Sequence, residues 1–133
     1  MSQENVEVAK RAVDAANRRD IDVFSEVATA DFKYVPALLM AFEGGSIRGR
    51  DGLQAWWDAM TNTWDEFRLI AEHFRDVGDQ VLVLGRADAR GRGSGVEIDA
   101  PMGLVLDFRA NRISRPRAFL DHTAALKAMG LEE

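Results

Sequence analysis

The fold is decided by residues 67–120, which read FRLIAEHFRDV-GD-QVLVLGRADAR-GRGSG-VEIDAPMGLVLDF-RAN-RISRPRAFL. Four runs in which apolar residues alternate with others predict β-strands at residues 67–77, 80–90, 96–108 and 112–120. The connections are short and contain the glycine, aspartate and asparagine residues typical of hairpin turns. Because short connections join antiparallel neighbours, we expect an antiparallel meander with an apolar face that other elements must cover.

Helices that can cover this sheet are predicted before and after it. Apolar residues at helical spacing predict a helix over residues 4–18. Asp20 or Asp22 is a candidate cap for a short second helix, because an aspartate side chain accepts hydrogen bonds from the first free N–H groups of a helix. By the same argument, Asp121 is a candidate cap for a last helix over residues 122–129.

The third predicted helix carries the strongest apolar stripe in the chain. We expect Asp51 to cap this helix and the helix to run to about residue 64. The residues of the stripe recur at helical intervals and are Leu53, Trp56, Trp57, Met60 and Trp64. Such a stripe is typical of a core face, and also of a pocket lined by core-facing aromatic residues. Before this helix, residues 32–35 predict a strand and residues 43–45 a turn.

The composition predicts one globular domain spanning residues 1–133, because 47% of the residues are hydrophobic and 29% are charged. A net charge of −5 argues against a nucleic-acid partner, which needs clustered positive charge. No apolar run approaches the length of about 20 residues that a membrane helix needs. The chain has no cysteine and starts with a polar segment rather than a secretion signal, so we expect a cytoplasmic location.

No metal site or cofactor is expected. The only two histidines, His73 and His122, are not joined by a spacing that brings metal ligands together. The glycine-rich segment 91–95 lies between two predicted strands rather than before a helix, so it predicts a hairpin tip and not a phosphate-binding loop.

Charged residues within the predicted strands are the candidates for chemistry. Arg86 and Asp88 share one strand face, and they form either a pocket pair or an ion pair on the solvated side. Both faces of that strand carry apolar residues, so the alternation alone does not show which face lines the pocket. Asp99 is a further pocket candidate, because small or apolar residues follow it on its face. His122 is either a surface residue or, with Asp121, an acid–base pair at a pocket mouth.

The last predicted strand has two different faces. Pro116, Ala118 and Leu120 form a small apolar face that suits a cavity wall. The opposite face carries Arg115, Arg117 and Phe119 and suits solvent or partner contacts. Because proline has no N–H to donate, we expect a bulge or an unpaired position at residue 116.

Four segments, taken in order, resemble the nuclear-transport-factor-2-like superfamily and, within it, the SnoaL-like group. They are residues 16–22 (ANRRDID), 47–53 (IRGRDGL), 93–98 (GSGVEI) and 119–122 (FLDH). The resemblance implies an α+β fold with a curved antiparallel sheet wrapped around N-terminal helices. It also implies a cone shape with an internal pocket, and usually a homodimer.

The superfamily includes polyketide cyclases, ketosteroid isomerase, limonene-epoxide hydrolase, scytalone dehydratase and non-catalytic binding modules, so the fold does not fix the function. Where the isomerase has its base and its tyrosine, this chain has Val35 and Ala12. Where the cyclases and the epoxide hydrolase have an acidic residue in the last strand, it has Ala118. None of these side chains transfers a proton. Arg86 and Asp88 resemble the arginine–aspartate pair of the epoxide hydrolase.

The leading hypothesis is a small-molecule-binding protein with an apolar pocket and no clear catalytic set. Its ligand is expected to be a small apolar molecule with one or two polar groups. The candidate lining residues are Tyr34, Trp56, Trp57, Met60, Met102 and Phe119. One alternative is a cyclase, isomerase or hydrolase that works without a metal, with Asp88 or Asp99 as base and Arg86 stabilising negative charge. The other alternative is a dimerisation or scaffold module with a filled core.

Overall fold

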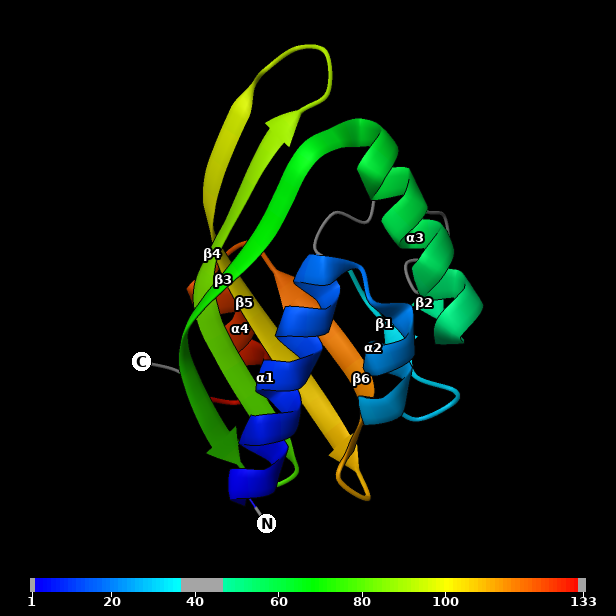
Figure 1. Ribbon diagram of the computed structural model, residues 1–133. Coiled ribbons are helices and arrows are strands. Elements are labelled where there is room, and N and C mark those ends of the chain that lie inside the picture. Colours follow the sequence, from blue (N-terminus) through cyan, green and yellow to red (C-terminus); the bar gives the residue numbers. More distant parts are fainter. Residues whose placement is uncertain (1, 37–46, 132–133) are drawn as a thin grey trace.

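A computed structural model describes residues 2–36 and 47–131 (Figure 1). The helices are α1 (Ser2–Arg18), α2 (Ile21–Val27), α3 (Gly49–Thr63) and α4 (His122–Ala128). The strands are β1 (Lys33–Tyr34), β2 (Ile47–Arg48), β3 (Trp64–Val77), β4 (Gln80–Gly91), β5 (Glu97–Arg109) and β6 (Arg112–Phe119). The turn predicted at residues 43–45 lies outside the described residues.

The four long strands form the predicted antiparallel meander in the order β3-β4-β5-β6. Helices α1, α2 and α3 lie on one face of this sheet, and α4 lies on the other (Figure 1). Strand β3 starts three residues before the predicted position, so α3 runs directly into it and the strand bends over to meet the helix (Figure 1). The expected α+β fold, with a sheet wrapped around N-terminal helices, is confirmed.

Two of the predicted helix caps are confirmed and one is wrong. The Asp20 side chain accepts a hydrogen bond from the Val23 N–H at the start of α2, and Asp121 accepts one from the Thr123 N–H at the start of α4. Helix α3 begins at Gly49, so Asp51 lies in its first turn instead of capping it. In that position its negative charge still interacts favourably with the helix dipole.

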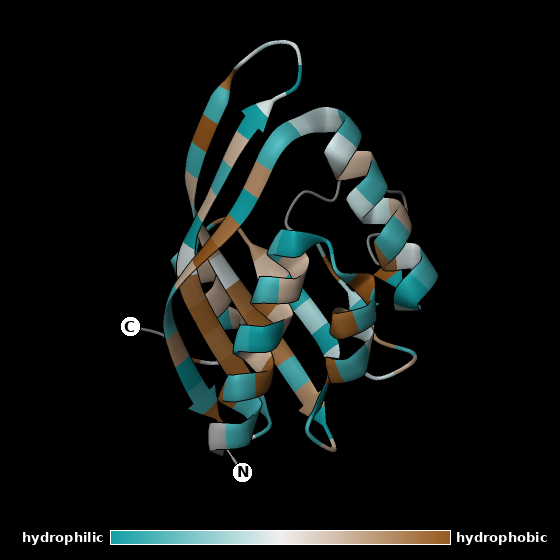
Figure 2. Ribbon diagram, viewed as in Figure 1, coloured by the Kyte–Doolittle hydropathy of each residue, from teal (hydrophilic) through white to brown (hydrophobic). Residues whose placement is uncertain are grey.

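The apolar residues form two clusters, one on each face of the sheet. The larger cluster joins α1, α2 and α3 to the inner sheet face, and the smaller joins Leu82 and Val105 of the sheet to Ala125 of α4. In Figure 2 the apolar residues concentrate in the sheet behind α1, whereas the tip of the β4–β5 hairpin is mainly hydrophilic. Strand β4 is therefore covered on both faces.

Pro116 lies at a position of β6 where a backbone N–H would not point toward β5, so its lack of an N–H costs no hydrogen bond between the two strands. Its carbonyl oxygen accepts a hydrogen bond from the Val35 N–H at 2.9 Å, so this part of its backbone faces away from β5. The irregularity expected at this residue occurs two residues earlier, where Ser114 has no partner between the pairs Asp107–Arg115 and Phe108–Ile113. β6 therefore contains an unpaired residue, as expected, but this residue is Ser114 and not Pro116.

Gly85 of β4 lies where the backbone of β3 approaches it most closely. A Cβ atom at this position would overlap the carbonyl oxygen of Ile70, next to the register shift between Ala71 and His73. Only glycine fits there, because the obstacle is backbone and cannot rotate away.

We predict that Gly85→Ala lowers the free energy of unfolding by about 2 kcal/mol or more, as expected for overpacking of a buried site. Urea denaturation followed by circular dichroism measures this change. Gly78→Ala is the matched control, because Gly78 has open space around it and only its positive φ of 63° disfavours alanine. Equal losses in the two variants would contradict the close-approach argument.

Candidate functional site

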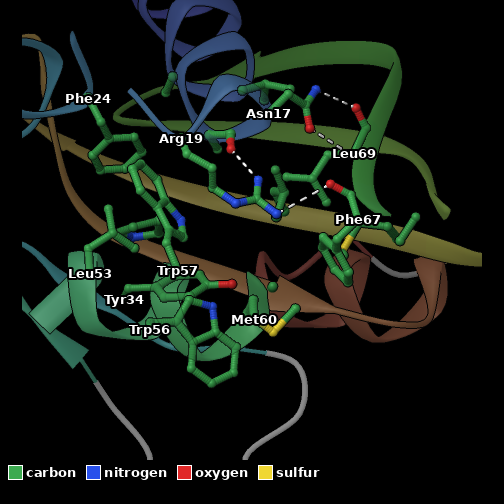
Figure 3. Close-up of a pocket in the computed structure, with 18 of the residues that line it drawn as sticks. Asn17, Arg19, Phe24, Tyr34, Leu53, Trp56, Trp57, Met60, Phe67 and Leu69 are labelled. Carbon is green, nitrogen blue, oxygen red and sulfur yellow. Dashed lines mark hydrogen bonds between the residues drawn. The ribbon is translucent and has the colours of Figure 1, made fainter. Parts of the chain in front are cut away.

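A pocket of about 230 Å³ lies between the inner face of the sheet and the helices (Figure 3). Its helical wall includes Ala12, Phe24, Leu53, Trp56, Trp57 and Met60. Its sheet wall includes Ala87, Ala89, Ala100, Met102, Leu104, Pro116 and Ala118. Almost all of these side chains are apolar, so the pocket suits a ligand with a largely apolar surface.

The pocket exists because the side chains on the inner sheet face become smaller along β4. Val81 and Val83 fill the core at one end, and Ala87 and Ala89 line the pocket at the other. Further small residues face the same space from α1, β5 and β6, namely Ala12, Ala16, Ala100 and Ala118. Where alanine methyl groups oppose one another across a layer, the side chains do not meet and space remains.

Aromatic rings hold the helical wall in place. The rings of Phe24 and Trp57 meet edge to face with centroids 6.1 Å apart, and Phe24 contacts Phe32 in the same way at 5.3 Å. Tyr34 meets Trp56 at 6.2 Å. Edge-to-face pairs of this kind fix ring orientations as well as burying surface. The pocket wall is therefore shaped by packed aromatic rings.

Five of the six predicted lining residues face the pocket: Tyr34, Trp56, Trp57, Met60 and Met102. Phe119 does not, and this prediction is corrected. It packs against the smaller cluster, next to Leu82 and Val105 on the α4 side of the sheet. The reason is the alternation along β6, where Ala118 and Leu120 point inward and Phe119 points outward.

The predicted catalytic residues Arg86, Asp88 and Asp99 come together, but none of them lines the pocket. Arg86 Nη2 lies 3.4 Å from Asp88 Oδ1, and Arg86 Nε lies 3.4 Å from Asp99 Oδ1. Both carboxylates are substantially exposed, Asp88 at 44% and Asp99 at 60%. They form a solvated ion-pair cluster on the outer sheet face, because the residues that alternate with them, such as Ala87 and Ala89, face inward.

His122 and Asp121 also lie away from the pocket lining. The His122 ring nitrogen Nε2 is 2.8 Å from the carbonyl oxygen of Gly85, and Asp121 caps α4 through the Thr123 N–H at 2.7 Å. Each side chain has its own backbone partner, and the structure shows no hydrogen bond between the two. Of the two alternatives for His122, the structure therefore does not support an acid–base pair with Asp121 at the pocket mouth.

Of the described lining residues, three bring polar side-chain groups other than indole N–H to the pocket, namely Asn17, Arg19 and Tyr34. Both ends of the Asn17 amide bond the backbone of Leu69, because the amide donates to the Leu69 carbonyl at 2.9 Å and accepts from the Leu69 N–H at 2.8 Å. This pair of bonds fastens the end of α1 to β3. Sequence reasoning missed Asn17 and Arg19, since it treated this segment only as a helix terminus.

Tyr34 enters the pocket wall from β1. Burial raises the pKa of its phenol to about 12. The hydroxyl therefore stays protonated at neutral pH and is available as a hydrogen-bond donor.

Within the described residues, no group of three or more histidine, cysteine, aspartate or glutamate side chains is placed to hold a metal ion. In the same part of the chain, no helix is long and apolar enough to span a bilayer.

The fold agrees with what comparison with known proteins finds. Residues 9–115 match the model of the SnoaL-like domain. The chain belongs to the SnoaL-like domain family. No protein with a curated description matches this SnoaL-like sequence.

Solved structures share the fold of this SnoaL-like domain over nearly the whole chain. An NTF2-like protein of unknown function from Burkholderia pseudomallei has a TM-score of 0.79 at 20% identity, covering 93% of this chain and 95% of its own. A putative SnoaL-like polyketide cyclase from Jannaschia has a TM-score of 0.76 at 20% identity, covering 99% and 95%. A protein with a ketosteroid isomerase-like fold from Catenulispora acidiphila, in complex with trimethylamine, has a TM-score of 0.74 at 18% identity, covering 94% and 93%.

We predict that Tyr34 ionises near pH 12 in the folded SnoaL-like domain and near pH 10 in urea. It is the only tyrosine, so tyrosinate absorbance reports it directly. Because the folded pKa is the higher one, Tyr34 contributes stability below pH 10 that is lost as the pH rises toward 12. A folded-state midpoint near pH 10, with the far-ultraviolet circular dichroism still native, would contradict the burial of the phenol.

Proposed function

We propose that this SnoaL-like domain binds a small, largely apolar molecule in the pocket and carries no acid–base catalytic set there. The composition of the lining supports the proposal. Among the described residues, those that line the pocket include no aspartate, glutamate or histidine. These are the side chains that most often act as general bases. The Tyr34 phenol, whose pKa burial raises to about 12, stays protonated at neutral pH and is a donor rather than a base.

The residues at the reactive positions of the relatives support binding over catalysis. Ala12 and Ala118 line the pocket at two places where the resemblance implies a tyrosine and an acid. The third place holds Val35, whose backbone bonds to β6 on both sides of Arg117. The candidate bases Asp88 and Asp99 are paired with Arg86 outside the pocket. Chemistry in the pocket thus lacks a proton acceptor among the described lining residues.

The size of the pocket favours a bound molecule over a filled-core scaffold. An apolar cavity of about 150 Å³ holds benzene, so a pocket of about 230 Å³ suits a substituted single-ring molecule. The structural neighbour from Catenulispora acidiphila is in complex with trimethylamine, which supports small-molecule binding in this fold. At 18% identity this neighbour supports small-molecule binding in this fold and does not indicate which ligand this chain binds.

We predict that benzyl alcohol, a neutral probe of this size, binds the pocket and that Ala118→Phe weakens binding at least about tenfold. The phenyl group fills the space that the alanine methyl leaves. Ligand-detected saturation-transfer NMR and calorimetry measure the binding.

Ala55→Phe is the matched control, because it makes the same change on the exposed side of α3. Ala100→Phe provides a second pocket-filling variant at a half-buried position, in case Ala118→Phe does not fold. Undiminished binding to both folded pocket variants would place the probe elsewhere and contradict the proposal.

We also propose a homodimer formed through the parts of the outer face of β4, β5 and β6 that α4 leaves uncovered. This face carries charges of both signs, with Arg86 beside Asp88 and Asp99, and Asp107 beside Arg115. A mixed pattern can complement itself across a two-fold axis.

We predict that light scattering after gel filtration gives twice the chain mass of 14.8 kDa. Asp99→Arg is expected to shift the mass toward the monomer, because it places a like charge beside Arg86. The control is Asp58→Arg, a matching charge reversal on exposed α3. A monomer mass for the unmodified chain would contradict the dimer and leave the pocket proposal intact.

A further inference from the structure

Arg19 occupies a backbone position that favours glycine. Helix α1 ends in a motif in which the Asp20 N–H bonds the Ala15 carbonyl at 2.9 Å and the Arg19 N–H bonds the Ala16 carbonyl at 3.2 Å. The residue after the helix is then left-handed, and Arg19 has a φ of 56°. A side chain there carries a steric cost of about 1 kcal/mol that glycine avoids. The residue at this position is nevertheless arginine, which has the largest of the cationic side chains.

The side chain of Arg19 turns into the pocket (Figure 3). Its Nη1 donates to the Ala16 carbonyl at 2.5 Å, and its Nη2 lies 3.4 Å from the Phe67 carbonyl. A guanidinium has five N–H donors. Among the described residues, these two contacts leave three donors unused, and the buried Nε has no hydrogen-bond partner. The guanidinium is held in place by backbone carbonyls but not neutralised by them.

The charge of Arg19 has no counter-ion in the described part of the chain. Three arginines in this part are half-buried, and the other two have carboxylate partners. Arg86 pairs with Asp88 and Asp99, and Arg117 pairs with Asp107. No ion pair joins Arg19 to any described carboxylate, and it is the only charged residue among the described lining residues. Burial of this unpaired cation lowers its pKa, a sign that the charge is partly desolvated.

Tyr34 contributes a second donor to the same space. Its hydroxyl makes no hydrogen bond to any described residue, and Figure 3 shows the hydroxyl and the Arg19 guanidinium pointing toward the middle of the pocket from different walls. Among the described lining residues, the pocket therefore combines an apolar surface with one fixed positive charge and the neutral phenol donor of Tyr34. This set of groups is complementary to an oxyanion on an apolar body.

We propose that the ligand is a small apolar monoanion whose charged oxygen atoms pair with Arg19 and accept a hydrogen bond from Tyr34. A carboxylate fits the planar guanidinium best, because it can accept two parallel N–H bonds. The body of the molecule, a substituted single ring in size, lies against Trp56, Trp57 and Met60. This inference rests on the proposed binding function and narrows the class of ligand.

The test compares three molecules with the same phenyl ring and different ends: phenylacetate, phenylacetamide and phenethylamine. Calorimetry on the full chain measures their affinities. Phenylacetate is expected to bind about tenfold to a hundredfold more tightly than the amide, which is the range for a hydrogen bond to a charged group. The amine is expected to bind most weakly, because it brings a second positive charge to Arg19.

Arg19→Gly is the sharpest variant, since glycine suits the left-handed backbone and this variant is expected to melt no lower than the unmodified protein. It should remove the preference for phenylacetate over the amide while leaving the amide affinity within about twofold. Arg19→Lys keeps the charge and should retain part of the preference. Arg18→Ala is the control, because it removes an equal charge from the neighbouring, exposed residue and should change nothing.

Two results would overturn the inference: equal affinities for the acid and the amide, or an unchanged preference in Arg19→Gly. In either case, amide binding that Ala118→Phe still blocks would leave the proposed binding function standing. If neither these molecules nor benzyl alcohol binds at millimolar concentration, the binding function fails together with the inference.

Discussion

Burial of strand β4 on both faces is the constraint on which the rest of the structure depends. Its odd-numbered residues Val81 and Val83 pack under the N-terminal helices, and the even-numbered Leu82 packs under α4. Further along the strand, Gly85 lets the backbone of β3 approach closely. The central strand thus fixes the distance of the helices from the sheet on one side and seats α4 on the other.

The same strand explains where the pocket lies. Large side chains packed between the sheet and helices α1 and α3 hold these helices away from the sheet. Further along β4, the inward-facing side chains are only the methyl groups of Ala87 and Ala89. Space opens where small residues from four elements face one another. Because the lining is almost entirely apolar, a single fixed charge in it acts through a low local dielectric and has a large effect on what binds.

The sequence predicts the strands well because alternation and turn residues are local signals. It does not predict which face of β4 lines the pocket, because two separate clusters bury both faces and the even-numbered residues are as apolar as the odd ones. The alternation therefore leaves open whether Arg86, Asp88 and Asp99 face the pocket or the solvent. The pocket-facing direction of Tyr34, Trp56 and Met60 is predictable, because helical spacing and a strand edge determine it. Arg19 escaped notice because its direction depends on a left-handed backbone and on the bonds between Asn17 and Leu69.

At the end of α1, a left-handed residue lies next to the contact between the helix and β3 and also lines the pocket. Asn17 fastens the helix to β3, and Arg19 uses the neighbouring Phe67 carbonyl of the same strand to hold its guanidinium. An anion bound to Arg19 would neutralise a charge that the folded chain otherwise keeps partly desolvated. It would therefore bind the folded state in preference to the unfolded one and stabilise the junction of α1 and β3 by mass action. A helix terminus that is locally unfavourable in the empty protein becomes favourable in the complex, which gives a physical reason for an arginine at a position that suits glycine.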